Sequence, residues 1–480
     1  MTVLLNARSD ITLDAFRRVA WDGEGVELGA QASAQMDRAH KAFDAYVKAR
    51  LAEDPDAVIY GVTTGPGDDG RRNLSEEAAS RRPTRLWTAG SFGEPLPERV
   101  VRGVVLARLA NFVEGHATAR SEVGRAIAAM LDDDRLPSVP AQSNGGAGEI
   151  LALGHLFYDL SVRLELTPKE RMALINGSPC AGALVSDGAL AAEGRTELAE
   201  AVFALATEAI GAPLEAYSAD VEVLWGDEQE TAALRSLRSL LEGHRTDRLP
   251  YQAPVSFRIL GRVLGRVRRA RSEAEQAATT ALRSVTDNPV YIPPDGSRPL
   301  GAVFSTGGYH NSRAMAALDG LAFAWADLCQ LAQRQTDALF QHPGTAPFLS
   351  VESGVKSLHM VQNGWAEEAR ALAQPTLLSQ GSFGQNDVPA LTFLAWRKAM
   401  AIGLCLDASL TVLAVLGAHA LHGSGHVAPP RLASIVEEVL RIVPPVTSVR
   451  RLGLDCDALH AAFTDRIFTK ESRFARLSRS

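Results

Sequence analysis

The pattern of hydrophobic positions predicts long helices over most of the chain. Apolar residues recur at helical spacing over residues 100–131 and again over 313–340. Segment 395–423 is apolar on nearly every side, which predicts a helix buried in a bundle or between subunits. Alternating strand patterns are rare, and the short candidates are DAVIYGV beginning at Asp56 and NPVYIP beginning at Asn288. The chain is therefore predicted to be mainly α-helical.

Glycine- and proline-rich stretches interrupt this pattern and mark loops. They lie at residues 61–70, 136–148, 289–301, 341–347 and 374–389. Because long helical patterns dominate after about residue 210, we expect two regions. Residues 1–210 form an irregular N-terminal domain, and residues 211–480 form a central bundle of long helices.

Composition and charge narrow the function classes. The 480 residues are 46% hydrophobic, which is enough for one large core or two domains. A net charge of -7 argues against a nucleic-acid-binding protein. The basic run at 261–276 is followed at once by acidic residues, which is typical of a solvated helix face. We find neither an uninterrupted apolar stretch of about 18 residues nor an export signal, so no membrane span is expected.

The cysteines predict a reducing compartment. Cys180, Cys329, Cys405 and Cys456 are widely scattered, with no CxxC pair and no Cys/His ligand spacing. They are interpreted as buried thiols of a cytoplasmic protein, and no metal site is expected.

Several loop segments together resemble the aromatic amino acid ammonia-lyase family, which includes histidine and phenylalanine ammonia-lyases. The segments are YGVTTGPG (60–67), AGSFGEPLP (89–97), LPSVPAQSNGGAGEILALGH (136–155), PKERMALINGS (168–178), SVTDNPV (284–290), GGYHNSRAMA (307–316) and AQPTLLSQGSFGQNDV (373–388). They occur in the family's order and cover most of the chain. The resemblance implies an ammonia-lyase-like long-helix bundle, and a homotetramer whose active sites draw on three subunits.

One departure concerns the family's electrophile. The family converts an Ala-Ser-Gly tripeptide into an imidazolone prosthetic group, MIO, and the serine loses its hydroxyl in the process. The aligned residues here are Gly146, Ala147 and Gly148. Ala147 has no hydroxyl to expel, so MIO is expected to be absent and no other cofactor is implied. The glycines then serve a tight turn before the helix that follows.

Two tyrosines are the candidate catalytic residues. Tyr60 aligns with the family's tyrosine that removes a proton from the carbon next to the leaving amine. A phenol with a pKa near 10 is a poor base unless a helix N-terminus or glycine-loop amides stabilise its anion. The alternative is a tyrosine that caps a short strand. Tyr251 aligns with a tyrosine that lines the family's pocket and is the second candidate.

The resemblance places further polar residues at the rim of the same site. Asn176 aligns with an asparagine that hydrogen-bonds near the substrate, and Tyr309 aligns with a phenylalanine that lines the pocket. Gln385 and Asp387 belong to segment 373–388, which resembles a family segment that contains acidic and amide side chains. Taken alone, a residue of any of these types is more often structural, with its polar atoms hydrogen-bonded within the protein.

Other positions depart from the family in ways that affect substrate binding. Pro254 replaces the arginine that binds the substrate carboxylate in the family. Proline cannot donate the two parallel hydrogen bonds that a guanidinium gives to a carboxylate. Arg258, Arg283 and Arg248 are the candidate replacements. Trp87 stands near the position that selects the substrate ring, which implies a smaller or differently shaped pocket, or stacking on a flat or cationic group. A tryptophan packed in the core is the alternative.

These features predict an enzyme that acts without MIO on a small molecule. Ammonia is a poor leaving group without the electrophile, so ordinary histidine or phenylalanine deamination is not expected. The substrate would carry its own activation, either a quaternary amine for elimination or an unsaturated acid derivative for conjugate addition or cyclisation. A biosynthetic intermediate of specialised metabolism fits this better than a free amino acid. The alternative is a catalytically inactive homologue kept as a scaffold or ligand-binding protein.

Overall fold

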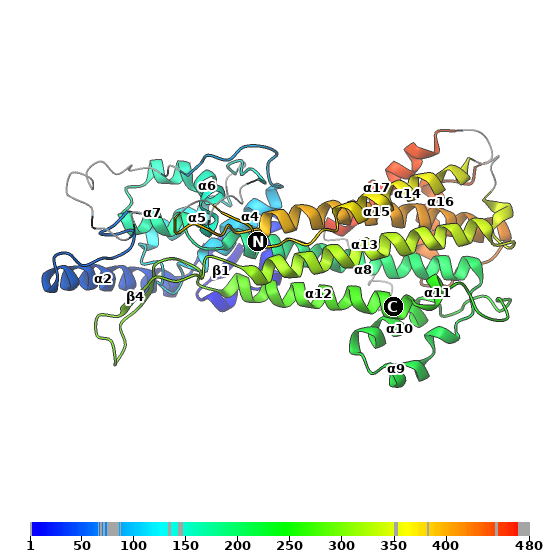
Figure 1. Ribbon diagram of the computed structural model, residues 1–480, viewed down its shortest axis with the longest axis horizontal. Coiled ribbons are helices and arrows are strands. Elements are labelled where there is room, and N and C mark those ends of the chain that lie inside the picture. The colour runs from blue at the N-terminus through cyan, green and yellow to red at the C-terminus, as the bar shows by residue number, and fades with distance from the viewer. Residues whose placement is uncertain are drawn as a thin grey trace. The chain divides into compact units, whose positions relative to one another are not determined.

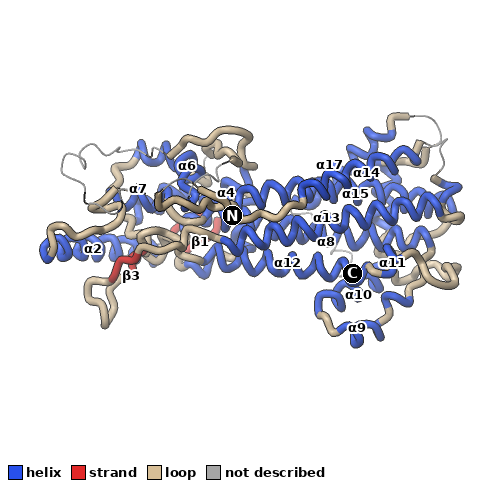
Figure 2. Tube along the Cα trace, viewed as in Figure 1, coloured by secondary structure: helices blue, strands red, loops and turns tan. Residues whose placement is uncertain are grey.

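The structure is a computed structural model that describes residues 2–65, 67, 70, 73, 86, 88–132, 136–142, 147–349, 354–381, 384–446 and 450–468. Helices prevail in it, as Figures 1 and 2 show, and the prediction of a mainly α fold is confirmed. The α-helices are α1 (Leu13–Ala20), α2 (Ala30–Glu53), α4 (Glu98–Leu109), α5 (Ser121–Ala129), α6 (Ile150–Arg163), α7 (Pro168–Ile175), α8 (Pro179–Ile210), α9 (Ala219–Trp225), α10 (Glu228–Leu240), α11 (Val255–Arg258), α12 (Leu260–Arg283), α13 (Ser312–Gln341), α14 (Leu358–Leu372), α15 (Thr392–Ser424), α16 (Ala433–Ile442) and α17 (Leu452–Phe468).

The chain divides into two compact units, each assembled from three segments. The first unit contains residues 1–187, 274–318 and 376–397, and the second contains 188–273, 319–375 and 398–480. Helices α8, α12, α13 and α15 each contribute residues to both units. The boundary predicted near residue 210 falls at the end of α8, inside the second unit, and stays a prediction.

Two short strand pairs accompany the helices. Strand β1 (Thr2–Leu5) runs parallel to β2 (Gly25–Leu28), and β3 (Val290–Ile292) runs antiparallel to β4 (Ala302–Phe304). The strand expected in the segment from Asn288 is therefore present. The alternation in β1 and β2 covers only four residues each, too few to distinguish a strand from chance in the sequence.

The strand expected in the segment from Asp56 is wrong. The chain turns there, because Gly61 adopts φ +69° and the Thr63 hydroxyl accepts a hydrogen bond from the Ile59 amide at 2.8 Å. None of the described strands includes residues 56–62, and Val58 is 56% exposed.

The helical pattern over 100–131 divides into α4 and α5. The chain between them reverses through Gly115 (φ +82°) and Thr118 (φ +56°), conformations that no α-helix contains. Every residue of α4 from Val100 to Leu109 is buried, including Arg102 and Arg108, whose guanidinium groups donate hydrogen bonds to backbone carbonyls.

Helix α15 matches the apolar segment predicted over 395–423. It is the one described helix long and apolar enough to cross a membrane by length and composition, and 83% of its most apolar window is buried within the chain. Such burial is typical of a core helix. The absence of a membrane span and a cytoplasmic location stay predictions.

Asp187 joins several helices of the first unit. Its fully buried carboxylate accepts hydrogen bonds from Trp21 Nε1 and Trp396 Nε1, both at 3.1 Å, and from Arg99 Nε at 2.8 Å. These donors come from the end of α1, from α15 and from α4. A buried carboxylate with this many donors is fully compensated, so Asp187 holds α8 in a defined place within the unit.

Glu149 caps the N-terminus of α8. It lies in the turn Ala147–Glu149 that leads into α6, with φ +60°. Its carboxylate accepts hydrogen bonds from the Cys180 amide at 2.6 Å and the Ala181 amide at 2.7 Å. Complete burial raises the pKa of Glu149 to about 7, against the opposing effect of these amides and of the Arg108 guanidinium. The turn at 147–149 is thereby attached to α8, a helix of 32 residues that starts in the first unit.

This burial predicts a pH-dependent stability. The folded protein holds a proton on Glu149 that the unfolded chain releases between about pH 4.5 and 7, so the free energy of unfolding falls as pH rises through that window. The loss from this group is about 3 kcal/mol. Glu149→Gln is expected to remove the contribution of this group to the fall of the unfolding free energy with pH. Urea unfolding at several pH values measures that fall.

The exposed Glu27→Gln provides the control and keeps the full slope. Glu197, whose pKa burial also raises to about 7, contributes equally to all three proteins. An unchanged slope in Glu149→Gln would contradict the assignment.

Candidate active site

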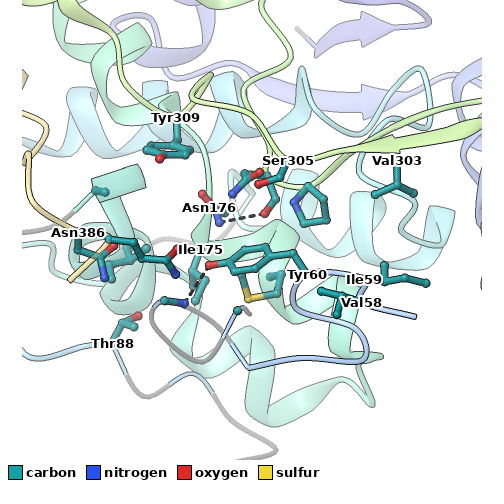
Figure 3. A pocket seen from close by; sticks show the side chains of 18 of the residues that line it. Val58, Ile59, Tyr60, Thr88, Ile175, Asn176, Val303, Ser305, Tyr309 and Asn386 are labelled. Carbon is teal, nitrogen blue, oxygen red and sulfur yellow. Dashed lines mark hydrogen bonds between the residues drawn. The ribbon is translucent and has the colours of Figure 1, made fainter. Parts of the chain in front are cut away.

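A cavity of about 450 Å³ lies in the first unit (Figure 3). It is bounded by the turn after α2, the start of α6, the end of α7, the loop after α12, the segment from β4 to α13 and the loop before α15. Its described lining is Tyr46, Val58, Ile59, Tyr60, Gly67, Gly70, Thr88, Ala147, Ile150, Met172, Ile175, Asn176, Asn288, Pro289, Val303, Ser305, Tyr309, Gln385 and Asn386. The cavity volume suits a small organic molecule.

Tyr60 points into this cavity, and its hydroxyl accepts a hydrogen bond from the Gly67 amide at 3.0 Å (Figure 3). Burial raises the pKa of Tyr60, and the Gly67 N–H opposes that rise. A backbone amide directed at the phenol oxygen stabilises the phenolate, as a proton acceptor requires. The glycine-loop amide expected from the sequence is therefore present.

The glycines around Tyr60 leave room for its ring. A Cβ on Gly70 would lie 2.6 Å from Tyr60 Cε2, and a Cβ on Gly61 would lie 2.7 Å from Met172 Cγ. Both distances are below any normal contact between carbon atoms. The spacing of glycines after Tyr60 thus serves close packing as well as the turn.

Asn176 forms the cavity wall next to the turn at 147–148. It ends α7, and its Nδ2 donates to the Asn288 carbonyl at 3.0 Å while its Oδ1 accepts from the Gly177 amide at 3.0 Å. Gly148 adopts φ +69°, and a Cβ there would lie 2.8 Å from Asn176 Oδ1. Only a glycine allows the turn to approach the amide this closely.

Tyr309 lines the cavity from the segment between β4 and α13 (Figure 3). Its side chain is half-buried, and a Cβ on Gly148 would lie 3.4 Å from Tyr309 Cβ. Tyr309 therefore packs against the turn that contains Ala147, whose side chain in this lining is a methyl group.

The loop before α15 contributes two amide side chains to the cavity. Gln385 and Asn386 line it, whereas Asp387 is exposed and does not. The Asp387 backbone carbonyl accepts from the Gly381 amide at 2.6 Å, which closes the loop on itself. The structure thus brings Tyr60, Asn176, Tyr309 and Gln385 together with Ala147, and their roles stay predictions.

Four other candidates are not among the described residues that line the cavity. Tyr251 is 70% exposed, and Arg258, exposed at the end of α11, donates to the Ala253 carbonyl at 2.9 Å; both belong to the second unit. Arg248 is paired with Glu208 in the same unit. Arg283 ends α12 with an exposed side chain and is not part of the lining. Trp87 and Gly146 lie outside the described residues.

Several lining residues were not anticipated. Asn288, Ser305 and Asn386 add polar groups to the cavity, and Tyr46 and Thr88 complete its wall. Asn288 and Asn386 belong to segments that carry the family resemblance, and that membership was the available signal. Tyr46 belongs to α2, where its spacing alone indicates only a helix face.

The described lining carries polar groups but no charged side chain. Charges lie behind it instead. Lys169 Nζ and Asp287 Oδ2 form a buried pair at 2.6 Å, and the fully buried Arg108 donates to the Asn176 carbonyl. These ions order the backbone of the wall without entering it.

The described residues contain no group of three or more His, Cys, Asp or Glu side chains arranged to hold a metal ion. Cys180, Cys329 and Cys405 are buried free thiols, and Cys456 is half-buried.

Comparisons with known proteins agree with this architecture. A histidine ammonia-lyase from Symbiobacterium thermophilum is 30% identical over 491 residues, which cover 94% of each chain. Tyrosine aminomutase from Streptomyces globisporus has a similar solved structure, with a TM-score of 0.83 and 22% identity over 97% of this chain and 96% of that one. Ergothionase from Treponema denticola gives a TM-score of 0.84 and 17% identity over 97% of this chain and 99% of that one.

The two structural similarities show a shared fold. The family profile described as aromatic amino acid lyase matches residues 11–163 and 160–443, which is most of the sequence. This protein therefore belongs to the aromatic amino acid lyase family.

Proposed function

We propose that this protein is a C–N lyase-type enzyme that acts without MIO on a self-activated, amino-acid-derived substrate. The observation that carries the proposal is the methyl side chain of Ala147 on the cavity wall. MIO formation expels a serine hydroxyl at this position, and a methyl group offers no leaving group. Residues 147 and 148 therefore do not fit the prosthetic group, and the reactivity has to come from the substrate.

Tyr60 is the proposed general acid and base. In elimination its phenolate takes a proton from the carbon next to the one that holds the nitrogen. The C–H electrons become the double bond, and the amine leaves with the C–N electron pair. A quaternary ammonium group leaves as a neutral amine, so it needs no electrophile. Support comes from the fold shared with ergothionase, described as an ergothioneine-degrading enzyme, because ergothioneine carries a trimethylammonium group.

The same site can run in reverse as conjugate addition. A nucleophile within the substrate adds to the double bond of an unsaturated acid derivative, and Tyr60 delivers the proton. The product is a ring, which suits a biosynthetic intermediate of specialised metabolism. The Gly67 amide supports both directions, because Tyr60 exchanges one proton in each.

The carboxyl of the substrate is proposed to be masked or to bind differently from the family's substrates. Pro254 stands where the family has its carboxylate-binding arginine, and the described lining carries no cation. In the homotetramer that the resemblance implies, the exposed Tyr251, Arg258 and Arg283 of another copy would complete the cavity. Arg248 is the weaker candidate because it is already paired with Glu208.

Two competing functions have specific support. The curated relatives are histidine ammonia-lyases, including the one at 30% identity, which favours deamination of histidine. The changes at Ala147 and Pro254 favour an inactive homologue that serves as a scaffold or binds a ligand. Consumption of a self-activated substrate, without release of ammonium from histidine, separates the proposal from both.

Tyr60→Phe is expected to lower turnover by about 100- to 10,000-fold, because it removes the proton-transferring hydroxyl and keeps the ring. The measurement is amine release from N,N,N-trimethyl-L-histidine and from the corresponding phenylalanine betaine. Tyr158→Phe, at a half-exposed site on α6, is the control and keeps the wild-type rate. Equal rates in wild type and Tyr60→Phe would show that another group moves the proton.

Intact-mass measurement tests the missing electrophile. The wild-type mass is expected to equal the mass calculated from the sequence, whereas a chain with MIO would lack two water molecules. Ala147→Ser restores the hydroxyl, so any loss of two waters in this variant shows that the turn can still cyclise. A wild-type mass that is short by two waters, or rapid ammonium release from histidine, would end the proposal.

A further inference from the structure

Tyr309 is a phenol on the cavity wall that the proposed proton transfer does not use. The family segment that 307–311 resembles has phenylalanine at this position, so the hydroxyl is a departure of this chain. The Cβ of Tyr309 lies beside the turn at 147–148, because a Cβ on Gly148 would come within 3.4 Å of it, and Tyr309 and Ala147 line the same cavity. A new polar residue thus belongs to the cavity wall that also contains the position from which the family forms its electrophile.

The Tyr309 hydroxyl is available to a ligand. Among the residues that the structure describes, none forms a hydrogen bond with it, although the side chain is half-buried and lines the cavity. A phenol can donate one hydrogen bond and accept others. An unused donor in a cavity is positioned to meet an acceptor on the substrate.

The two phenols have different surroundings, which suit different roles. The Gly67 N–H points at the Tyr60 oxygen and favours its phenolate, whereas no described donor points at the Tyr309 oxygen. Negative charge on Tyr309 would also raise the pKa of Tyr60, so the site does not hold two phenolates easily. Tyr60 therefore has the backbone contact that a proton-transferring phenol needs, whereas the Tyr309 hydroxyl keeps its hydrogen-bonding capacity for a ligand.

The segment that carries Tyr309 is anchored on both sides. The Thr306 amide donates to Asn288 Oδ1 at 2.8 Å, and the His310 Nε2–H lies 3.2 Å from the Pro389 carbonyl. The Ser178 hydroxyl reaches the Gly308 carbonyl at 3.4 Å. A donor that is held in place before the substrate binds costs little reorganisation during the reaction.

We propose that Tyr309 is a catalytic residue whose O–H donates to the carbonyl oxygen of an α,β-unsaturated amide or ester and stabilises the enolate formed during conjugate addition. This inference rests on the proposed function and narrows its substrate class. A neutral carbonyl matches a lining without charged side chains among the described residues. Tyrosine hydroxyls are effective donors to developing oxyanions.

The addition step balances without a further reactant. The lone pair of the substrate's internal N–H or O–H nucleophile forms a bond to the β-carbon, and the double-bond electrons move onto the carbonyl oxygen beside Tyr309. The enolate then takes a proton from the Tyr60 hydroxyl at its α-carbon. The nucleophile returns its proton to the Tyr60 phenolate, so the net change is addition of one X–H bond across the double bond.

The test uses trans-cinnamamide labelled with carbon-13 at the carbonyl, because its binding is read without turnover. Isotope-edited infrared spectra are expected to show a lower carbonyl stretching frequency in the wild-type complex than in water. Tyr309→Phe restores the family's residue and should lose most of that shift, whereas Tyr60→Phe should keep it. No shift in the wild type, including failure of the amide to bind, or an equal shift in Tyr309→Phe, would overturn the inference.

Activity provides the second readout. With an unsaturated amide that bears an internal amine, Tyr309→Phe should lower kcat about 100- to 1,000-fold and change KM little, as expected for a donor that acts on developing charge. An unchanged kcat would overturn the catalytic role. If Tyr60→Phe keeps full activity while the infrared shift depends on Tyr309, the proposed function fails and the carbonyl contact stands.

Discussion

One backbone hydrogen bond, from the Gly67 amide to the Tyr60 hydroxyl, distinguishes the two phenols discussed for this cavity. Burial raises the pKa of Tyr60, because water no longer stabilises its anion, and the Gly67 amide opposes that rise. No described group donates a hydrogen bond to the Tyr309 hydroxyl. Under the proposed function, which uses no built-in electrophile, such a difference lets the two side chains take different parts in proton transfer and hydrogen bonding.

Buried ionisable side chains lie behind the described lining of the cavity, which carries no charged side chain. Glu149 holds the first amides of α8, Lys169 pairs with Asp287, and Arg108 reaches the Asn176 carbonyl. Placing ions one layer behind the cavity orders the backbone that presents Asn176 and the turn at 147–148. Helix ends and opposite charges partly neutralise these groups, and the described lining of the cavity presents amides and phenols rather than full charges.

The helical architecture could be read from the sequence because its apolar positions repeat at helical spacing over long stretches. The α15 segment is the clearest example, since it is apolar on nearly every side and is buried. The division of 100–131 into α4 and α5 was not visible, because it depends on positive φ at Gly115 and Thr118. The segment at Asp56 was misassigned because its alternation is local, whereas a strand needs a partner that the sequence does not reveal.

The candidate site could be predicted only where a loop resembled the family. Tyr60, Asn176, Tyr309 and Gln385 met in one cavity although they are far apart in the chain, whereas Tyr251, Arg258 and Arg283 did not reach it. The resemblance predicts which residues matter but not which of them line the cavity of one folded chain. Ser305 and Tyr46 had no chemical signal, because their place in the wall arises only from packing.

The contact between residue 70 and the Tyr60 ring has a consequence for the history of this chain. A methyl group at position 70 would overlap the ring, so a mutation there is tolerated only if residue 60 shrinks or moves first. The two positions are therefore expected to co-vary among relatives. In relatives in which position 60 is not a tyrosine, position 70 is no longer restricted to glycine. A larger residue at position 70 would therefore indicate that the phenol at position 60 has been lost.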